Sequence, residues 1–255
     1  MKITRAVVPS LFTVLNMFCG FLSIIHTAAG DYILASWFII LAGMCDVLDG
    51  MMARLTKSYS DFGVEFDSLS DIISFGAAPS FLVYTIHLHN LNGMGILLSS
   101  FPLIFGGMRL ARFNVQMVGY DKDYFKGLPI PSTAIIISSY VLTYYNETNG
   151  FSDLPALMLI LLVVVVSLLM VSNIKYDNFP KFTRRGIVQH PVRFTLGVVG
   201  ITAIVITQGR ALFPCFIFYL STGPIRYLGR AIQHALHPQA KEMDEKEAEI
   251  TSVDI

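Results

Sequence analysis

Long apolar segments alternate with short polar connections along most of this chain, and that alternation is its dominant pattern. A helix that crosses a bilayer needs about 20 mostly apolar residues, and eight segments approach that length. We expect helices over residues 8–28, 33–53, 62–86, 93–113, 131–146, 154–173, 193–208 and 211–229. The pattern therefore predicts an all-α polytopic membrane protein with about eight transmembrane helices.

The composition supports a membrane protein and argues against a soluble enzyme. Hydrophobic residues make up 54% of the chain and charged residues only 14%, and the mean hydropathy is +0.60. Soluble domains carry about 25% charged residues, so this much apolar surface does not fit one soluble core. The net charge is zero, and we expect no nucleic-acid partner.

The basic residues indicate how the chain is oriented in the membrane. With the N-terminus in the cytoplasm, 17 of the 18 Lys and Arg residues fall on the cytoplasmic side, leaving only Arg210 outside. This is the bias that the positive-inside rule describes. We therefore expect both termini to be cytoplasmic and the protein to lie in the cytoplasmic (inner) membrane. Residues 1–232 are predicted to form a transmembrane catalytic domain, and residues 233–255 a charged cytoplasmic tail.

Four aspartates at fixed spacing are the most informative feature of the sequence. The pattern reads D-x-x-D-G-x-x-A-R, then eight residues, then G-x-x-x-D-x-x-x-D. Its fixed positions are Asp46, Asp49, Gly50, Ala53, Arg54, Gly63, Asp67 and Asp71. Spacings of three and four place the first four of these residues on one helix face and the last three on a face of the next helix. An Asp at the centre of a spanning helix costs roughly 2.5–3.5 kcal/mol, so these carboxylates need partners.

Multivalent cations are the partners that such a cluster favours. Oxygen ligands without His or thiolate suit Mg²⁺, Mn²⁺ or Ca²⁺ better than zinc. Carboxylates that bridge two such ions are used to clamp a phosphoryl group. The connection between Arg54 and Ser60 is short, so we expect two antiparallel neighbouring helices with all four carboxylates at one depth, near the cytoplasmic surface. An ion pathway, a buried ion pair or simple helix packing is the structural alternative.

The complete pattern resembles the signature of the CDP-alcohol phosphatidyltransferase family. The resemblance implies two divalent cations per site, Mg²⁺ or Mn²⁺, and no organic cofactor. These ions would hold the diphosphate of a CDP-linked lipid while an alcohol attacks the lipid-side phosphorus and CMP leaves. It also implies that the protein is a homodimer among membrane lipids. Mapped by position, the metal ligands would be Asp46, Asp49, Asp67 and Asp71.

The same resemblance assigns further roles around the cluster. Asp71 would also be the general base, because a carboxylate within hydrogen-bond reach can take the proton of the attacking hydroxyl. Gly50, Ala53 and Gly63 would line the pocket for the cytidine diphosphate of the lipid, and Arg54 would stabilise the acidic cluster or a phosphate.

Three further segments resemble the phosphatidylserine synthase branch of that family. They are Gly106–Asn114, Lys126–Pro131 and Ser172–Tyr176. The resemblance implies CDP-diacylglycerol and L-serine as substrates. A guanidinium fork suits the carboxylate of an amino acid, so Arg109, Arg112 and Lys126 are the predicted acceptor-binding residues. Ordinary positive-inside residues are the alternative interpretation of the two arginines.

The first apolar segment carries a stripe of polar and small residues. Pro9, Thr13, Asn16 and Gly20 lie at helical spacing. Thr13 and Asn16 are predicted to bind the CDP-lipid, since an Asn side chain can both donate to and accept from a base or a phosphate. Hydrogen bonds between helices are the alternative role.

Two other functions remain open at this point. Within the family, glycerol 3-phosphate could replace serine as acceptor. An acceptor that carries a phosphate would need a larger basic pocket, and the basic residues near the Asp cluster in sequence are just Arg54 and Lys57. From another class, a cation transporter could use the aspartates as ion ligands. Transporters typically show inverted repeats or broken helices at the midplane, and neither is visible in the sequence.

Overall fold

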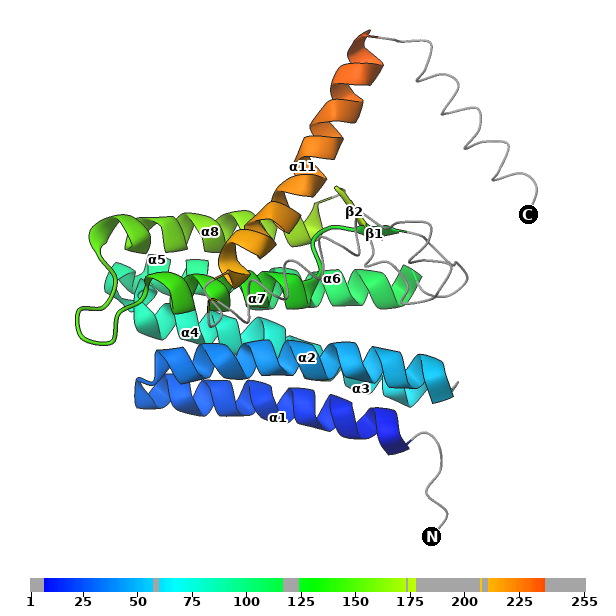
Figure 1. The fold of residues 1–255 in the computed structure, drawn as a ribbon, viewed down its shortest axis with the longest axis horizontal. Helices are drawn as coiled ribbons and strands as arrows, with labels where there is room; N and C mark the ends of the chain where they lie inside the picture. The colour runs from blue at the N-terminus through cyan, green and yellow to red at the C-terminus, as the bar shows by residue number, and fades with distance from the viewer. Residues whose placement is uncertain are drawn as a thin grey trace.

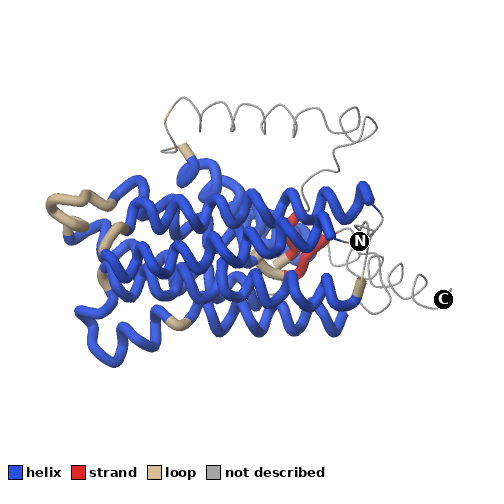
Figure 2. Tube along the Cα trace, turned by 90° about the horizontal axis from the view of Figure 1, so that it is seen from below, coloured by secondary structure: helices blue, strands red, loops and turns tan. Residues whose placement is uncertain are grey.

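The structure is a computed structural model that describes residues 7–56, 60–116, 124–172, 174–177, 207 and 211–236. Within these residues the protein is helical except for one short two-stranded ribbon. Helices α1 to α8 run side by side along one direction, and the turns between them gather at the two ends of the bundle (Figures 1 and 2). The predicted all-α class is confirmed.

The first two predicted helices form with nearly the expected bounds. They are α1, Val7–Ala29, and α2, Tyr32–Thr56. Gly30, with φ of +87°, separates them, and the Asp31 amide donates to the His26 carbonyl at 2.9 Å. A glycine in the left-handed region is a common helix terminator, so α2 returns antiparallel along α1.

The third and fourth predicted segments are each divided. The third consists of α3, Asp61–Asp71, the π-helical turn η1, Ile72–Ala77, and α4, Ala78–Ile86. The fourth consists of η2, Leu88–Leu91, α5, Asn92–Ser99, and α6, Phe101–Gln116. Apolar periodicity cannot reveal a π-turn, because that turn adds one residue to a helix without changing its composition.

The remaining described elements are two helices of the bundle, one oblique helix and the ribbon. They are α7, Ile130–Tyr144, α8, Asp153–Val171, α11, Leu212–Leu236, β1, Tyr124–Lys126, and β2, Lys175–Asp177. The strands pair antiparallel, with Lys126 opposite Lys175. The predicted helix over residues 193–208 lies outside the described residues.

Five described helical segments are long and apolar enough to cross a membrane. They cover Leu11–Ala29, Tyr32–Leu55, Phe62–Ile86, Leu88–Val115 and Asp153–Val171. The apolar helical stretches Ile130–Tyr144 and Leu212–Ile225 are shorter. The predicted total of eight spans therefore stays a prediction.

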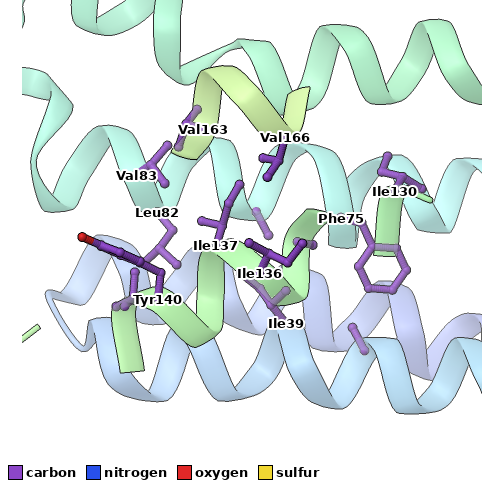
Figure 3. Close-up of a cluster of buried hydrophobic side chains, with 14 of the residues drawn as sticks. Ile39, Phe75, Leu82, Val83, Ile130, Ile136, Ile137, Tyr140, Val163 and Val166 are labelled. Atoms are coloured by element: carbon purple, nitrogen blue, oxygen red, sulfur yellow. The ribbon is translucent and has the colours of Figure 1, made fainter. Parts of the chain in front are cut away.

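Helix α7 lies at the centre of the packed core. Nearly all of its residues from Ile130 to Val141 are buried, and it packs against α2, α8 and α11. Figure 3 shows its side chains Ile136, Ile137 and Tyr140 meeting residues of the neighbouring helices. By contrast, the outer helices expose large apolar side chains such as Phe21 and Leu161, as expected for surfaces that face lipid.

One end of the bundle collects the elements that bear the sequence motifs. Helix α2 ends and α3 begins there, and the ribbon of β1 and β2 lies at the same end (right in Figure 1). Ser60 caps α3: its Oγ accepts a hydrogen bond from the Gly63 amide at 3.0 Å. This cap fixes the start of the helix that carries Asp67 and Asp71.

Candidate active site

Three of the four motif aspartates converge in space. Asp46 of α2 and Asp67 and Asp71 of α3 each offer a carboxylate oxygen, and these oxygens lie within 4.8 Å of one another. Asp71 is buried, with 7% of its surface exposed, whereas Asp46 and Asp67 are half-buried. Carboxylates this close repel one another when ionised. A divalent cation between them would remove that repulsion, and an all-oxygen donor set fits Mg²⁺ or Mn²⁺.

Asp49 lies beside this cluster with a partner of its own. It accepts a hydrogen bond from the Thr13 hydroxyl of α1 and is as buried as Asp71. It is still close enough to interact electrostatically with Asp46 and Asp67. The structure therefore separates the four predicted ligands into a close set of three and a fourth carboxylate held by α1.

Helix α1 forms a wall of the site that contacts both halves of the motif. It packs closely on α2 and also on α3 and η1, whereas α2 and α3 make few close backbone contacts with each other. The helices α2 and α3 face each other across the carboxylates, as expected, and α1 lies against both. The carboxylates of Asp46 and Asp67 meet across the space between the two helices.

Both predicted polar residues of α1 point into the site, toward carboxylates. Asn16 is fully buried, and its Nδ2 donates to Asp71 Oδ1 at 3.1 Å. Thr13, which is 4% exposed, donates to Asp49. Hydrogen bonding between helices, the alternative role for these two residues, is thus what the structure records.

Among the small residues of the motif, Gly50 has open space beside its backbone, whereas a Cβ at Gly63 would lie 3.1 Å from Ser60 Oγ. A Cβ added to Gly50 would meet only Arg54 Nη2, at 4.0 Å, and both residues are exposed. Ala53 and Gly63 are half-buried. Space that a side chain could fill without a clash can also admit the backbone-hugging part of a ligand.

The two predicted acceptor arginines occupy different environments. Arg109 is 7% exposed and close enough to Asp71 for an electrostatic interaction. Arg112 is half-buried and donates to the Val171 carbonyl at 3.1 Å and to the Met170 carbonyl at 3.5 Å. Arg112 therefore uses part of its donor capacity to cap the C-terminus of α8.

The three segments associated with the serine-using branch meet at that same end of α8. The Gly127 amide donates to the Ile174 carbonyl at 2.9 Å, and the Leu128 amide to the Leu169 carbonyl at 3.0 Å. Gly127 has φ of +81°, and a Cβ there would lie 2.1 Å from the Met170 carbonyl oxygen. Lys126 precedes this turn in β1. Segments far apart in sequence thus form one structure at the end of α8 that Arg112 caps.

Four polar residues of the site were not predicted as site residues from the sequence. Ser70 Oγ donates to the Thr13 carbonyl at 3.0 Å, and Ser74 Oγ donates to the Asn16 carbonyl at 2.8 Å. Asn114 Nδ2 of α6 donates to Ser68 Oγ of α3 at 3.0 Å. The spacing of Ser70 and Ser74 by four residues on the Asp helix is the signal that could have identified the first pair.

Fold and site together define a class: a helical membrane protein with a carboxylate cluster set near one end of its bundle. The model of the family described as CDP-alcohol phosphatidyltransferase matches residues 6–171, which include every motif position. This chain belongs to the CDP-alcohol phosphatidyltransferase family.

Curated relatives extend the similarity over most of the chain. The CDP-diacylglycerol–serine O-phosphatidyltransferase of Helicobacter pylori is 35% identical over 222 residues, which cover 86% of this chain and 90% of that protein. The archaetidylserine synthase of Methanothermobacter thermautotrophicus is 39% identical over 180 residues, or 69% of this chain and 72% of that protein. The CDP-diacylglycerol–serine O-phosphatidyltransferase of Bacillus subtilis is 34% identical over 175 residues, which cover 68% of this chain and 92% of that protein.

Proposed function

We propose that this protein transfers the phosphatidyl group of CDP-diacylglycerol to the hydroxyl of L-serine, giving phosphatidylserine and CMP. One observation carries the proposal: the three segments that resemble the serine-using branch converge at the end of α8 that Arg112 caps. Arg109, one turn before Arg112 on α6, interacts electrostatically with Asp71 of the carboxylate cluster. The names of the relatives from Helicobacter pylori and Bacillus subtilis support the same acceptor.

In the proposed reaction the serine oxygen attacks the phosphorus that carries the diacylglycerol. A new P–O bond forms to serine, the P–O bond to CMP breaks, and CMP leaves with the bonding electron pair. Asp71 takes the proton of the serine hydroxyl, which an ordinary hydroxyl must lose to become a good nucleophile. None of the fixed positions of the motif is Ser, Cys or His, which favours this direct displacement over a covalent intermediate.

Asp46, Asp67 and Asp71 would hold a divalent cation, and Asp49 would complete the ligand set for a second one. When bound, such ions neutralise the charge that grows on the bridging oxygen as CMP departs. The protein's own part is to fix the carboxylates. Thr13 holds Asp49, and α3 places Asp67 and Asp71 one turn apart.

The remaining substrate contacts follow from the space around the cluster. Gly50, Ala53 and Gly63 would allow the cytidine diphosphate to lie against the backbones of α2 and α3, and Arg54 would contact a phosphate or the acidic cluster. Arg109 is the stronger candidate for the serine carboxylate, since it is buried near Asp71. Arg112 and Lys126 would border the same acceptor site.

The setting is part of the proposal. Residues 1–232 would form the catalytic membrane domain, and residues 233–255 a cytoplasmic tail, with both termini and the site on the cytoplasmic side of the inner membrane. The bias of 17 of 18 basic residues to one side supports this orientation. Family resemblance supports a homodimer.

A cysteine introduced by Lys57→Cys should resist a membrane-impermeant thiol reagent in intact cells, and rapid labelling would contradict the orientation.

Acceptor-dependent release of CMP tests the proposed function. Purified protein in mixed micelles receives CDP-diacylglycerol, Mn²⁺ or Mg²⁺, and one acceptor at a time: L-serine, glycerol 3-phosphate or inositol. We expect CMP and phosphatidylserine with serine, and background release from an Asp46→Asn control. A clear preference for another acceptor would overturn the serine assignment. Absence of CMP with every acceptor, together with cation flux into proteoliposomes, would favour the transporter.

A further inference from the structure

The hydrogen bond between Asn16 and Asp71 joins two residues that lie 55 positions apart in the sequence. Asn16 has no exposed surface, and Asp71 is 7% exposed. A nucleotide or a lipid phosphate cannot reach a fully buried amide unless α1 moves away from α3. The contact that Asn16 makes in this structure is therefore with the carboxylate, which differs from the substrate contact that the sequence predicts for it.

A second hydrogen bond fixes the backbone of Asn16 to the same helical segment. Ser74 Oγ, three residues beyond Asp71, donates to the Asn16 carbonyl at 2.8 Å. Gly20 permits this approach, because a Cβ at that position would lie 2.4 Å from Ser74 Oγ and 2.7 Å from Ser74 Cα. Asn16 is thus held by its main chain while its side chain reaches Asp71.

The same arrangement recurs one turn away. Thr13 donates to Asp49, and its own carbonyl accepts a hydrogen bond from Ser70 Oγ at 3.0 Å. Ser70 immediately precedes Asp71, so serine hydroxyls bind α1 on both sides of that aspartate. The π-helical turn η1 begins at the very next residue, Ile72, and such turns are frequent at functional sites.

The amide of Asn16 does little for the fold by itself. Its Oδ1 is buried and accepts no hydrogen bond within the described part of the chain. A buried polar atom without a partner costs free energy, so an apolar side chain of similar size would be compatible with folding. The contribution of Asn16 must then lie in its donor group, which faces Asp71.

We infer that Asn16 is a positioning residue for Asp71, and that the hydrogen bond from Ser74 to the Asn16 carbonyl fixes the position of the Asn16 side-chain amide. The amide donor fixes Oδ1 of Asp71. This orients the remaining oxygen toward the cluster shared with Asp46 and Asp67. Side chains that bind a metal are commonly oriented by a hydrogen bond to a neighbouring residue that does not bind the metal itself. The inference rests on the proposed function for the role of Asp71, but the Asn16–Asp71 coupling can be measured without any acceptor.

The test combines kinetics with binding of Mn²⁺ alone, followed by electron paramagnetic resonance. Asn16→Leu keeps the approximate size and removes the donor. We expect turnover and Mn²⁺ affinity each to fall by about 10- to 100-fold, the usual cost of losing such a partner. The KM for CDP-diacylglycerol should stay close to its normal value. Ser23→Ala is the matched control: Ser23 is also buried on α1, and its hydroxyl has no partner among the described residues.

A double-mutant cycle distinguishes positioning from general damage to the site. The effect of Asn16→Leu on Mn²⁺ affinity should largely disappear in an Asp71→Asn background, because the carboxylate that the amide orients is gone, and should persist in an Asp49→Asn background. Equal effects in both backgrounds would overturn the inference. A raised KM for CDP-diacylglycerol with normal turnover and Mn²⁺ affinity would also overturn it, by making Asn16 a nucleotide contact.

Ser74→Ala provides a milder second variant if Asn16→Leu does not fold. It removes only the hydroxyl that holds the Asn16 carbonyl, and it should weaken Mn²⁺ binding in the same direction by a smaller factor. Normal Mn²⁺ affinity and turnover in Ser74→Ala would contradict the anchoring role. Failure of the proposed function is seen separately, as the wrong acceptor preference of the unmodified protein.

Discussion

Replacing Gly20 by Ala adds a single methyl group where α1 closely approaches η1, the π-helical turn that follows Asp71. The new Cβ would lie 2.7 Å from Ser74 Cα and 2.4 Å from Ser74 Oγ. Non-bonded carbons prefer about 3.5–4.0 Å. Rotation of the serine side chain relieves the contact with Oγ but not the contact with the backbone. The two helices must therefore separate locally by about 1 Å.

Two opposing terms determine how Gly20→Ala affects stability. Overpacking in a close-packed contact costs typically 1–3 kcal/mol, while Ala is favoured over Gly inside a helix by about 1 kcal/mol. The net destabilisation should therefore be about 0–2 kcal/mol. The variant should still fold and insert into the membrane.

Activity should respond far more strongly than stability. Asp71 lies three residues before Ser74 and is tied to α1 through Asn16. A misplacement of about 1 Å at a reacting group can cost roughly 100-fold in rate, which corresponds to about 2.7 kcal/mol of transition-state stabilisation. We expect a loss of that order in the turnover of CMP release.

The assay compares turnover and thermal unfolding for the wild type, Gly20→Ala and a matched control. Gly93→Ala is the control, because Gly93 is also helical and a Cβ there meets nothing within 4 Å. Its turnover should equal that of the wild type. Near-normal turnover of Gly20→Ala would show that the α1–η1 contact does not position Asp71, and the reasoning above would be refuted.

Two other substitutions test the substrate sites. Gly50→Ala should not lower the unfolding temperature, because only Arg54 Nη2 lies within 4.0 Å of the new Cβ and Ala is favoured over Gly inside a helix by about 1 kcal/mol. It should raise the KM for CDP-diacylglycerol, and an unchanged KM would remove Gly50 from the nucleotide pocket. Arg112→Ala should lower the unfolding temperature, because it removes the cap of α8. If the guanidinium also binds the acceptor, the serine KM should rise roughly 10- to 150-fold, since a hydrogen bond to a charged group is worth about 1.5–3 kcal/mol. Lower stability with a normal serine KM would leave Arg112 as a structural cap.

The long apolar segments made the helices predictable. Helices α1 and α2 extend over Val7–Ala29 and Tyr32–Thr56, close to the predicted 8–28 and 33–53. Their composition is what a bilayer requires of any spanning helix, so their existence follows from local sequence. Helical spacing predicted that Asp67 and Asp71 share one helix face, and the short connection after Arg54 predicted that Asp46 lies near them. The bond that holds Asp49 to Thr13 instead was not predictable from spacing.

The contacts across the site were less accessible to sequence reasoning. The bond from Ser74 to Asn16 joins residues 58 positions apart, and it exists only because Gly20 allows two helices to approach closely. The placement of Arg112 on the carbonyls of α8 likewise depends on how α6 and α8 pack. Such contacts depend on packing geometry, which a hydrophobic pattern does not specify.

Direct measurement of cation binding tests the central claim, that the carboxylates of Asp46, Asp67 and Asp71 form the metal site of this enzyme. Bound Mn²⁺ is counted by electron paramagnetic resonance on purified protein supplied with CDP-diacylglycerol. The account predicts about two ions per chain and a large loss of bound Mn²⁺ in Asp67→Asn. Glu65→Gln, at an exposed acidic position of the same helix, should bind as the wild type does. Undiminished Mn²⁺ binding in Asp67→Asn, at wild-type affinity, would contradict the account.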